Sequence, residues 1–159
     1  MTKNYNEKQS APRGLRGNLV LIGLRGSGKT TVGRRLARTL GCGFVDTDVW
    51  VTKSSGKTIP ELFAQGGEIL FRRFENQAVA QLLAHPSPTI VATGGGVVLQ
   101  LQNRRILAQF GTIVYLRAPV SVLLQRIKDS DRPPLTDFDP IAEMTYVRAK
   151  REPLYLQLA

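Results

Sequence analysis

The fold of this chain is decided by the stretch Gly23-Leu24-Arg25-Gly26-Ser27-Gly28-Lys29-Thr30. An apolar run over 19–22 precedes it, and a segment with helical spacing of apolar residues follows over 30–40. Its glycines allow backbone N–H groups to turn inward around phosphate oxygens, and the positive end of the following helix attracts the same anions. The pattern GxxxxGK[ST], placed between a strand and a helix, therefore predicts a phosphate-binding loop.

Two side chains of this loop are expected to act directly on a nucleotide. Lys29 should reach the β- and γ-phosphates, and the Thr30 hydroxyl should ligate Mg²⁺. The loop alone does not distinguish a GTPase, a motor ATPase or a metabolite kinase. The Asn-Lys-x-Asp motif typical of guanine-specific GTPases is absent from the sequence, and 159 residues are few for a motor ATPase. These two observations favour a small nucleotide or metabolite kinase.

Strand and helix patterns alternate on the carboxyl side of the loop. Thr58-Ile59-Pro60-Glu61 is typical of a helix start, and Gly66-Gly67 should interrupt that helix. Asp139-Pro140 should begin a last helix, which Pro153 should end or kink near Glu152. Further buried strands are predicted at 44–45, 89–93 and 112–116, and further helices at 68–84, 103–110 and 119–128. Such alternation predicts right-handed βαβ units in one α/β domain with a parallel sheet.

The composition limits the classes of protein to which this chain can belong. A hydrophobic fraction of 42% is enough for a packed core, and no apolar run approaches the roughly 18 residues of a membrane span. The single cysteine, Cys42, cannot form an internal disulfide, which fits a cytoplasmic protein. The net charge of +10 is spread along the chain, which favours ATP and a carboxylate substrate over nucleic acid. We expect a cytoplasmic monomer without membrane contact, with a flexible basic tail over 1–17 and one domain over 18–159.

Two further motifs follow predicted strands, at the sheet edge where ligands gather in parallel sheets. In Asp46-Thr47-Asp48, one carboxylate could reach Mg²⁺ through water while the other accepts hydrogen bonds from substrate hydroxyls. The alternative is that one aspartate caps a helix and the other is solvated. Gly94-Gly95-Gly96 could expose backbone N–H groups to a ligand, or it could be a flexible turn.

Three arginines are candidates for binding anionic groups. Arg72 lies in a predicted helix, Arg132 in the proline-rich segment 129–140, which should be a mobile loop, and Arg151 near the end of the last helix. The planar guanidinium group suits bidentate contacts with carboxylate and phosphate. Since the chain has many arginines, each of the three could instead be a solvated surface residue.

Taken together, these motifs resemble the shikimate kinase family over about 18–158. The resemblance rests on Gly-Ser-Gly-Lys-Thr-Thr at 26–31, Asp46-Thr47-Asp48, Phe71-Arg72-Arg73-Phe74-Glu75, Gly94-Gly95-Gly96, Arg132-Pro133-Pro134-Leu135 and Arg151-Glu152-Pro153-Leu154-Tyr155. It implies a P-loop NTPase fold of three α/β/α layers, with a central parallel sheet in the order 2-3-1-4-5. It also implies ATP-dependent phosphorylation of the 3-hydroxyl of shikimate, giving shikimate 3-phosphate and ADP in aromatic amino acid biosynthesis.

The resemblance also implies roles for individual residues. Lys29, Asp48 and Arg132 would be catalytic, and Thr30 and Asp46 would support Mg²⁺. A lid over about 128–139 would close on the nucleotide and carry Arg132. ATP would contact Gly26, Ser27, Gly28, Lys29, Thr30, Thr31 and Arg132, and shikimate would contact Asp48, Arg72, Gly94, Gly95, Gly96 and Arg151.

The sequence departs from the family pattern at its carboxyl end. Family members usually continue with a fifth strand and a final helix, joined by a loop that touches adenine. We therefore expect a chain that ends at Ala159 to bind ATP weakly, and calorimetry with and without an added carboxyl-terminal segment tests this. Equal affinities would contradict it.

Two alternative functions stay open. They are a gluconate-kinase-like enzyme, which shares the phosphate loop, and a ligand-sensing module without turnover.

Overall fold

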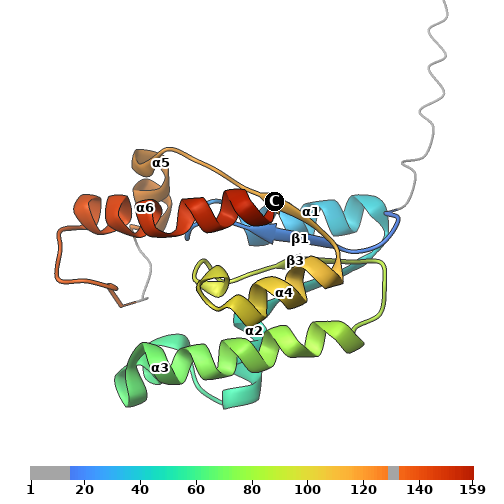
Figure 1. The fold of residues 1–159 in the computed structure, drawn as a ribbon, viewed down its shortest axis with the longest axis horizontal. Helices are drawn as coiled ribbons and strands as arrows, with labels where there is room; N and C mark the ends of the chain where they lie inside the picture. Colours follow the sequence, from blue (N-terminus) through green and yellow to red (C-terminus); the bar gives the residue numbers. More distant parts are fainter. Residues whose placement is uncertain (1–14, 129–132) are drawn as a thin grey trace, which may run out of the picture.

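A central parallel sheet organises this protein, for which a computed structural model describes residues 15–128 and 133–159 (Figure 1). The four strands in the described residues are β1 (Leu19–Ile22), β2 (Gly43–Asp46), β3 (Thr89–Ala92) and β4 (Thr112–Tyr115). They lie in the order β2-β3-β1-β4, and every neighbouring pair is parallel. This order matches the first four positions of the predicted topology.

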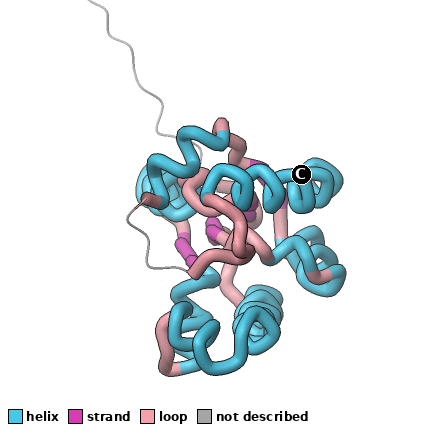
Figure 2. The backbone as a smooth tube through the Cα atoms, turned by 90° about the vertical axis from the view of Figure 1, so that its left-hand side faces the viewer, coloured by secondary structure: helices cyan, strands magenta, loops and turns pink. Residues whose placement is uncertain are grey.

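Six helices surround the sheet in the described part of the chain. In Figure 2 the magenta strands lie in the middle of the molecule, with the cyan helices around them. They are α1 (Lys29–Leu40), α2 (Thr47–Ser55), α3 (Ile59–Ala80), α4 (Leu101–Phe110), α5 (Val120–Ile127) and α6 (Pro140–Leu158), with short 3₁₀ turns η1 (Gln81–Ala84) and η2 (Val97–Leu99). The predicted strands and long helices are confirmed, with ends that shift by a few residues. The helix predicted over 68–84, for example, becomes 3₁₀ after Ala80.

The sheet is covered on both faces, which explains why its strands are continuous apolar runs. Leu21 and Ile90 point to one face, where they pack with Ala37 of α1. The alternate residues Val20 and Val91 point to the other face. There they pack against side chains of α3, α4 and α6 that include Val79, Leu107 and Val147. The result is the expected arrangement of three layers.

A second hydrophobic cluster joins α2 to α3, which lie side by side in Figure 1. Val51 of α2 is fully buried against Leu62 and Phe71 of α3. Phe74 is partly buried against the same cluster. This helix pair positions Asp48 at the start of α2 and Arg72 in the middle of α3.

The start and the interruption of α3 are as predicted. The Thr58 side chain accepts a hydrogen bond from Glu61 N, and the Glu61 carboxylate accepts one from Thr58 N, which completes a capping box. The backbone leaves helical geometry at Gly66 and Gly67. Gly67 has φ 61° and ψ −161°, a region in which only glycine is comfortable.

Replacing Thr58 with alanine should lower the free energy of unfolding by about 1 kcal/mol, because it leaves the first-turn N–H groups of α3 without their cap. Urea denaturation followed by circular dichroism measures this. The matched control is Thr39→Ala, since Thr39 is also exposed but bonds back to Arg35 O within α1. An equal loss in both variants would contradict a specific capping effect.

Two local features differ from what the sequence indicated. Pro153 was expected to end or kink the last helix, and it does not end it, because α6 continues to Leu158. Tyr155, Leu154 and Leu158 pack against the main core beyond the proline, and this burial outweighs the hydrogen bond that the ring removes. The segment 47–55 was not predicted as a helix, yet it forms α2.

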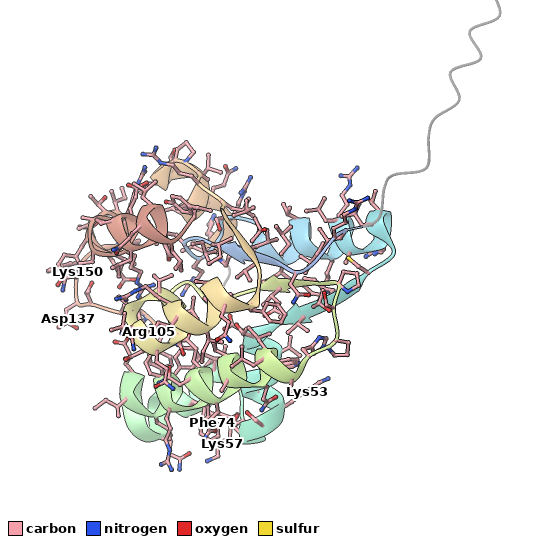
Figure 3. All side chains as sticks on the ribbon, turned by 45° about the vertical axis from the view of Figure 1, so that its right-hand side comes forward. Lys53, Lys57, Phe74, Arg105, Asp137 and Lys150 are labelled. Carbon is pink, nitrogen blue, oxygen red and sulfur yellow. The ribbon has the colours of Figure 1, made fainter. Side chains whose placement is uncertain are left out.

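The surface of the described residues bears on two of the composition arguments. No helix within 15–128 or 133–159 is both long and apolar enough to cross a membrane. Basic side chains come from separate elements, as Figure 3 shows for Lys53, Lys57, Arg105 and Lys150. The positive charge is therefore distributed over the surface.

Candidate active site

The phosphate-binding loop joins β1 to α1, and its backbone requires glycine at two positions. Gly26 has φ 80°, and a β-carbon there would lie 2.9 Å from Ile127 Cγ2. Gly28 has φ 95° and is the residue that caps α1. The loop therefore presents its N–H groups at the amino end of a twelve-residue helix, where an anion is favoured.

An open cleft of about 640 Å³ lies over this loop. All six residues predicted to contact ATP in the loop, Gly26 to Thr31, line it. Asp48 lines it as well, together with Arg126, which the sequence analysis did not select. Arg126 Nη1 donates to the Gly26 carbonyl at 3.1 Å, but it belongs to no motif that could have marked it.

Lys29 is held across the loop that precedes it. Its Nζ donates to Gly23 O at 2.9 Å and to Leu24 O at 2.8 Å, and only 8% of the residue is exposed. These contacts fix the ammonium group beside the loop's N–H groups. The arrangement concentrates positive charge where a polyphosphate would lie.

Thr30 and Asp46 meet at the carboxyl end of β2. The Thr30 hydroxyl donates to Asp46 Oδ2 at 2.7 Å. Asp46 Oδ1 accepts from Asp48 N at 3.0 Å and so caps α2. The capping alternative is therefore correct for Asp46, and it leaves the other oxygen facing Thr30.

These oxygens suit a hard cation such as Mg²⁺, which uses few protein ligands beside phosphates and water. No group of three or more His, Cys, Asp or Glu side chains that could hold a metal occurs among the described residues. The Thr30 hydroxyl and the Asp46 carboxylate fit the chemistry of a magnesium site that phosphate oxygens would complete.

The glycine segment, defined here as Gly94 to Gly96, packs more closely than the sequence analysis expected. A β-carbon on Gly94 would lie 2.9 Å from Asp48 Oδ1 and 2.7 Å from Glu75 Oε1, and one on Gly96 would overlap the Arg72 guanidinium. The Gly94 N–H donates to Thr47 Oγ1 at 3.1 Å. Glycine is thus required at 94 and 96 for close approach of side chains, and the Gly94 N–H is already bonded within the protein.

A small pocket of about 60 Å³ is lined by the glycine segment. We call it the arginine pocket, because Arg72 of α3 and Arg151 of α6 line it. Arg25 and Gly95 line both this pocket and the cleft, so the two spaces adjoin. Arg132 lies outside the described residues, and the structure does not place it.

The two arginine side chains that line the arginine pocket favour the binding of an anion. Arg72 is 8% exposed, and it binds Glu75 Oε2 at 2.6 Å and Glu68 Oε1 at 2.8 Å. Burial works against the charged form of Arg72, but these carboxylates outweigh it and raise the pKa of Arg72. Burial lowers the pKa of Arg151, and the charge of Arg72 acts in the same direction. Arg72 and Arg151 both line the pocket, and the lowered pKa of Arg151 shows that its surroundings disfavour the positive charge. A bound carboxylate would compensate for this.

Buried Glu75 contacts Arg72, a role that the sequence analysis did not assign, although it named Glu75 as part of the motif Phe71-Arg72-Arg73-Phe74-Glu75. Its carboxylate accepts a hydrogen bond from Arg72 Nη1 and so holds the guanidinium group in place. Burial raises the pKa of Glu75, although the Arg72 charge opposes this. The three-residue spacing from Arg72 on one helix face was the signal that could have assigned this contact.

Comparison with known proteins gives this geometry a context. A family model described as shikimate kinase matches residues 25–159. The chain belongs to the shikimate kinase family. Shikimate kinase 2 of Serratia proteamaculans is 43% identical over 145 residues, which cover 89% of this chain and 82% of the relative. Shikimate kinase of Neisseria gonorrhoeae is 42% identical over 144 residues, which cover 90% of this chain and 84% of that relative.

Solved structures agree with the shikimate kinase assignment. Shikimate kinase from Acinetobacter baumannii in complex with shikimate has a TM-score of 0.85 and 40% identity, over 90% of this chain and 80% of that chain. Deoxyadenosine kinase from M. mycoides has a TM-score of 0.59 at 14% identity, over 88% of this chain and 83% of that chain, and shows the fold alone. The fold therefore extends to nucleoside kinases, while the sequence relationship is to shikimate kinases, which are ATP-dependent enzymes.

Proposed function

We propose that this protein transfers the γ-phosphate of ATP to the 3-hydroxyl of shikimate, giving shikimate 3-phosphate and ADP in aromatic amino acid biosynthesis. One observation carries the proposal within the shikimate kinase family. A phosphate-loop cleft adjoins a pocket with two buried arginines. Asp48 lines the cleft and lies close to Gly94 of the glycine segment, whose Gly95 lines both spaces. A donor phosphate and an acidic alcohol can thus lie next to each other.

The cleft would bind ATP through the residues of the phosphate loop. The N–H groups of 26–31 would surround the phosphates, and Lys29 would move its ammonium contacts from loop carbonyls to phosphate oxygens. Thr30 and Asp46, already in contact, would hold Mg²⁺. When bound, this ion would neutralise charge on the β- and γ-phosphates.

The arginine pocket would bind the acceptor. Arg72 and Arg151 would pair with the shikimate carboxylate, and the glycine segment would form a close backbone wall beside the ring. Asp48 would accept a hydrogen bond from the 3-hydroxyl and aim it at the phosphate. Catalysis would then consist mainly of positioning and charge stabilisation, as phosphoryl transfer requires.

Several features of the proposal rest on the sequence. They are the catalytic role of Arg132, the lid over about 128–139 and the single kinase domain over 18–159. Most of the predicted basic tail over 1–17, and residues 129–132 of the lid, lie outside the described residues. We also propose a cytoplasmic monomer whose partners are ATP and shikimate, without nucleic acid or membrane. The exclusion of nucleic acid is supported by the spread of basic residues along the sequence and by the separate positions of Lys53, Arg105 and Lys150 in Figure 3.

A coupled assay of ADP release with a panel of acceptors tests the activity. We expect ADP formation that requires Mg²⁺, ATP and shikimate, and none above background with gluconate. Turnover with gluconate alone would favour the gluconate-kinase-like alternative. Tight shikimate binding without turnover would favour the ligand-sensing module and contradict the proposal.

A further inference from the structure

A buried tyrosine links helix α6 to the boundary between the cleft and the arginine pocket. The Tyr155 hydroxyl donates a hydrogen bond to the Gly95 carbonyl, and the residue is 0% exposed. Its ring stacks on Tyr115 of β4, with centroids 4.9 Å apart. Tyr155 also lies one helical turn after Arg151, on the same face of α6. One side chain therefore joins the helix that carries Arg151 to the glycine segment.

The opposite side of Gly95 rests on the phosphate loop. A β-carbon on Gly95 would lie 3.2 Å from Arg25 N and 3.4 Å from Gly23 O, so the two backbones are close. Gly95 therefore contacts both the phosphate loop and the Tyr155 hydroxyl. Because Gly95 lines both spaces, its position sets how the acceptor faces the donor phosphate.

The Tyr155 hydroxyl is a permanent donor. Burial raises the pKa of Tyr155 well above its ordinary value, although the nearby charge of Arg151 acts in the opposite direction. The hydroxyl thus keeps its proton at neutral pH, and the Gly95 carbonyl has a constant partner. Loss of the hydroxyl would leave a partly buried carbonyl without this bond and would remove a polar group that neighbours Arg151.

We propose that Tyr155 is a positioning residue for the acceptor, which holds Arg151 and Gly95 in fixed relation so that the shikimate carboxylate and the attacking hydroxyl are placed together. This inference rests on the proposed function. It concerns a residue that contacts two elements of the site, and it assigns Tyr155 no direct contact with the reacting atoms.

Tyr155→Phe tests the proposal because it removes only the hydroxyl and keeps the stacked ring. We expect the KM for shikimate to rise about tenfold, which corresponds to about 1.4 kcal/mol, while the KM for ATP changes by less than about twofold. The matched control is Tyr115→Phe, whose hydroxyl donates instead to Glu152 Oε1 outside the pocket. That variant should leave both KM values unchanged.

A second substrate separates positioning from general damage. The methyl ester of shikimate lacks the charge that Arg151 would bind, so Tyr155→Phe should affect its KM much less than that of shikimate. Thermal unfolding of both variants sets an assay temperature at which each is fully folded.

The possible outcomes distinguish this inference from the proposed function. Normal wild-type turnover with an unchanged shikimate KM in Tyr155→Phe would overturn the inference alone. Equal increases for shikimate and ATP, or for Tyr155→Phe and Tyr115→Phe, would also overturn it, because they indicate a structural effect. Absence of wild-type turnover with shikimate would overturn the proposed function and this inference with it.

Discussion

Replacing Lys29 with alanine is expected to abolish shikimate-dependent ADP formation, with kcat reduced at least about a thousandfold. The charge that develops on the γ-phosphoryl oxygens needs a fixed cation nearby, and Lys29 is the ammonium group that lines the phosphate-loop cleft. Its Nζ is buried and bonded to Gly23 O and Leu24 O, so the ammonium group is held in place beside the cleft. Steady-state ADP release measures the loss.

Two further variants show whether the effect of Lys29 is chemical. Lys53→Ala removes an exposed ammonium group from α2, away from the cleft, and should retain wild-type activity. Lys29→Arg keeps the charge but not the compact ammonium shape, and should recover little activity. Thermal unfolding checks the loop, which loses two Lys29 hydrogen bonds in the alanine variant. Substantial activity in folded Lys29→Ala would contradict the role given to this residue.

Replacing Asp48 with asparagine should lower kcat by about 10²–10⁴-fold and raise the KM for shikimate. The amide keeps the shape of the side chain but loses the negative charge that orients the hydroxyl and can take its proton. Asp48 lines the cleft and lies against Gly94, where donor and acceptor would meet. Kinetics at saturating ATP, with shikimate varied, measure both parameters.

Asp46→Asn provides the contrast to Asp48→Asn, because Asp46 bonds to Thr30 and is assigned to the metal. That variant should need a higher Mg²⁺ concentration for half-maximal rate, with a smaller change in the shikimate KM. Asp48→Asn should show the ordinary Mg²⁺ requirement. The two roles would be wrongly assigned if the magnesium dependence shifted in Asp48→Asn alone.

Local sequence patterns predicted the parts of the fold that depend on neighbouring residues. The helix starts at Thr58 and at Asp139-Pro140 satisfy backbone N–H groups within one turn, and the phosphate loop has a fixed spacing of glycines before Lys29, so the residues of all three are diagnostic. The strands were visible because burial on both faces makes them uniformly apolar. The family resemblance then supplied the order of the strands.

Features that depend on tertiary packing were not predictable in the same way. Helix α2 has no apolar periodicity, and it forms because Asp46 caps it and Val51 packs against α3. Pro153 remains helical because the core holds the residues after it. Arg126 and Tyr155 contact site residues that are distant in sequence, so no local pattern could show their contacts.

The close packing of the glycine segment has a consequence for inhibitors of this enzyme family. A compound that packs against the glycine segment would contact main-chain atoms, whose positions a point mutation does not alter directly. Any side chain introduced at Gly96 would displace the Arg72 guanidinium, and one at Gly94 would collide with two carboxylates. Escape from such a compound by substitution at these positions would therefore also damage the binding of the natural acceptor.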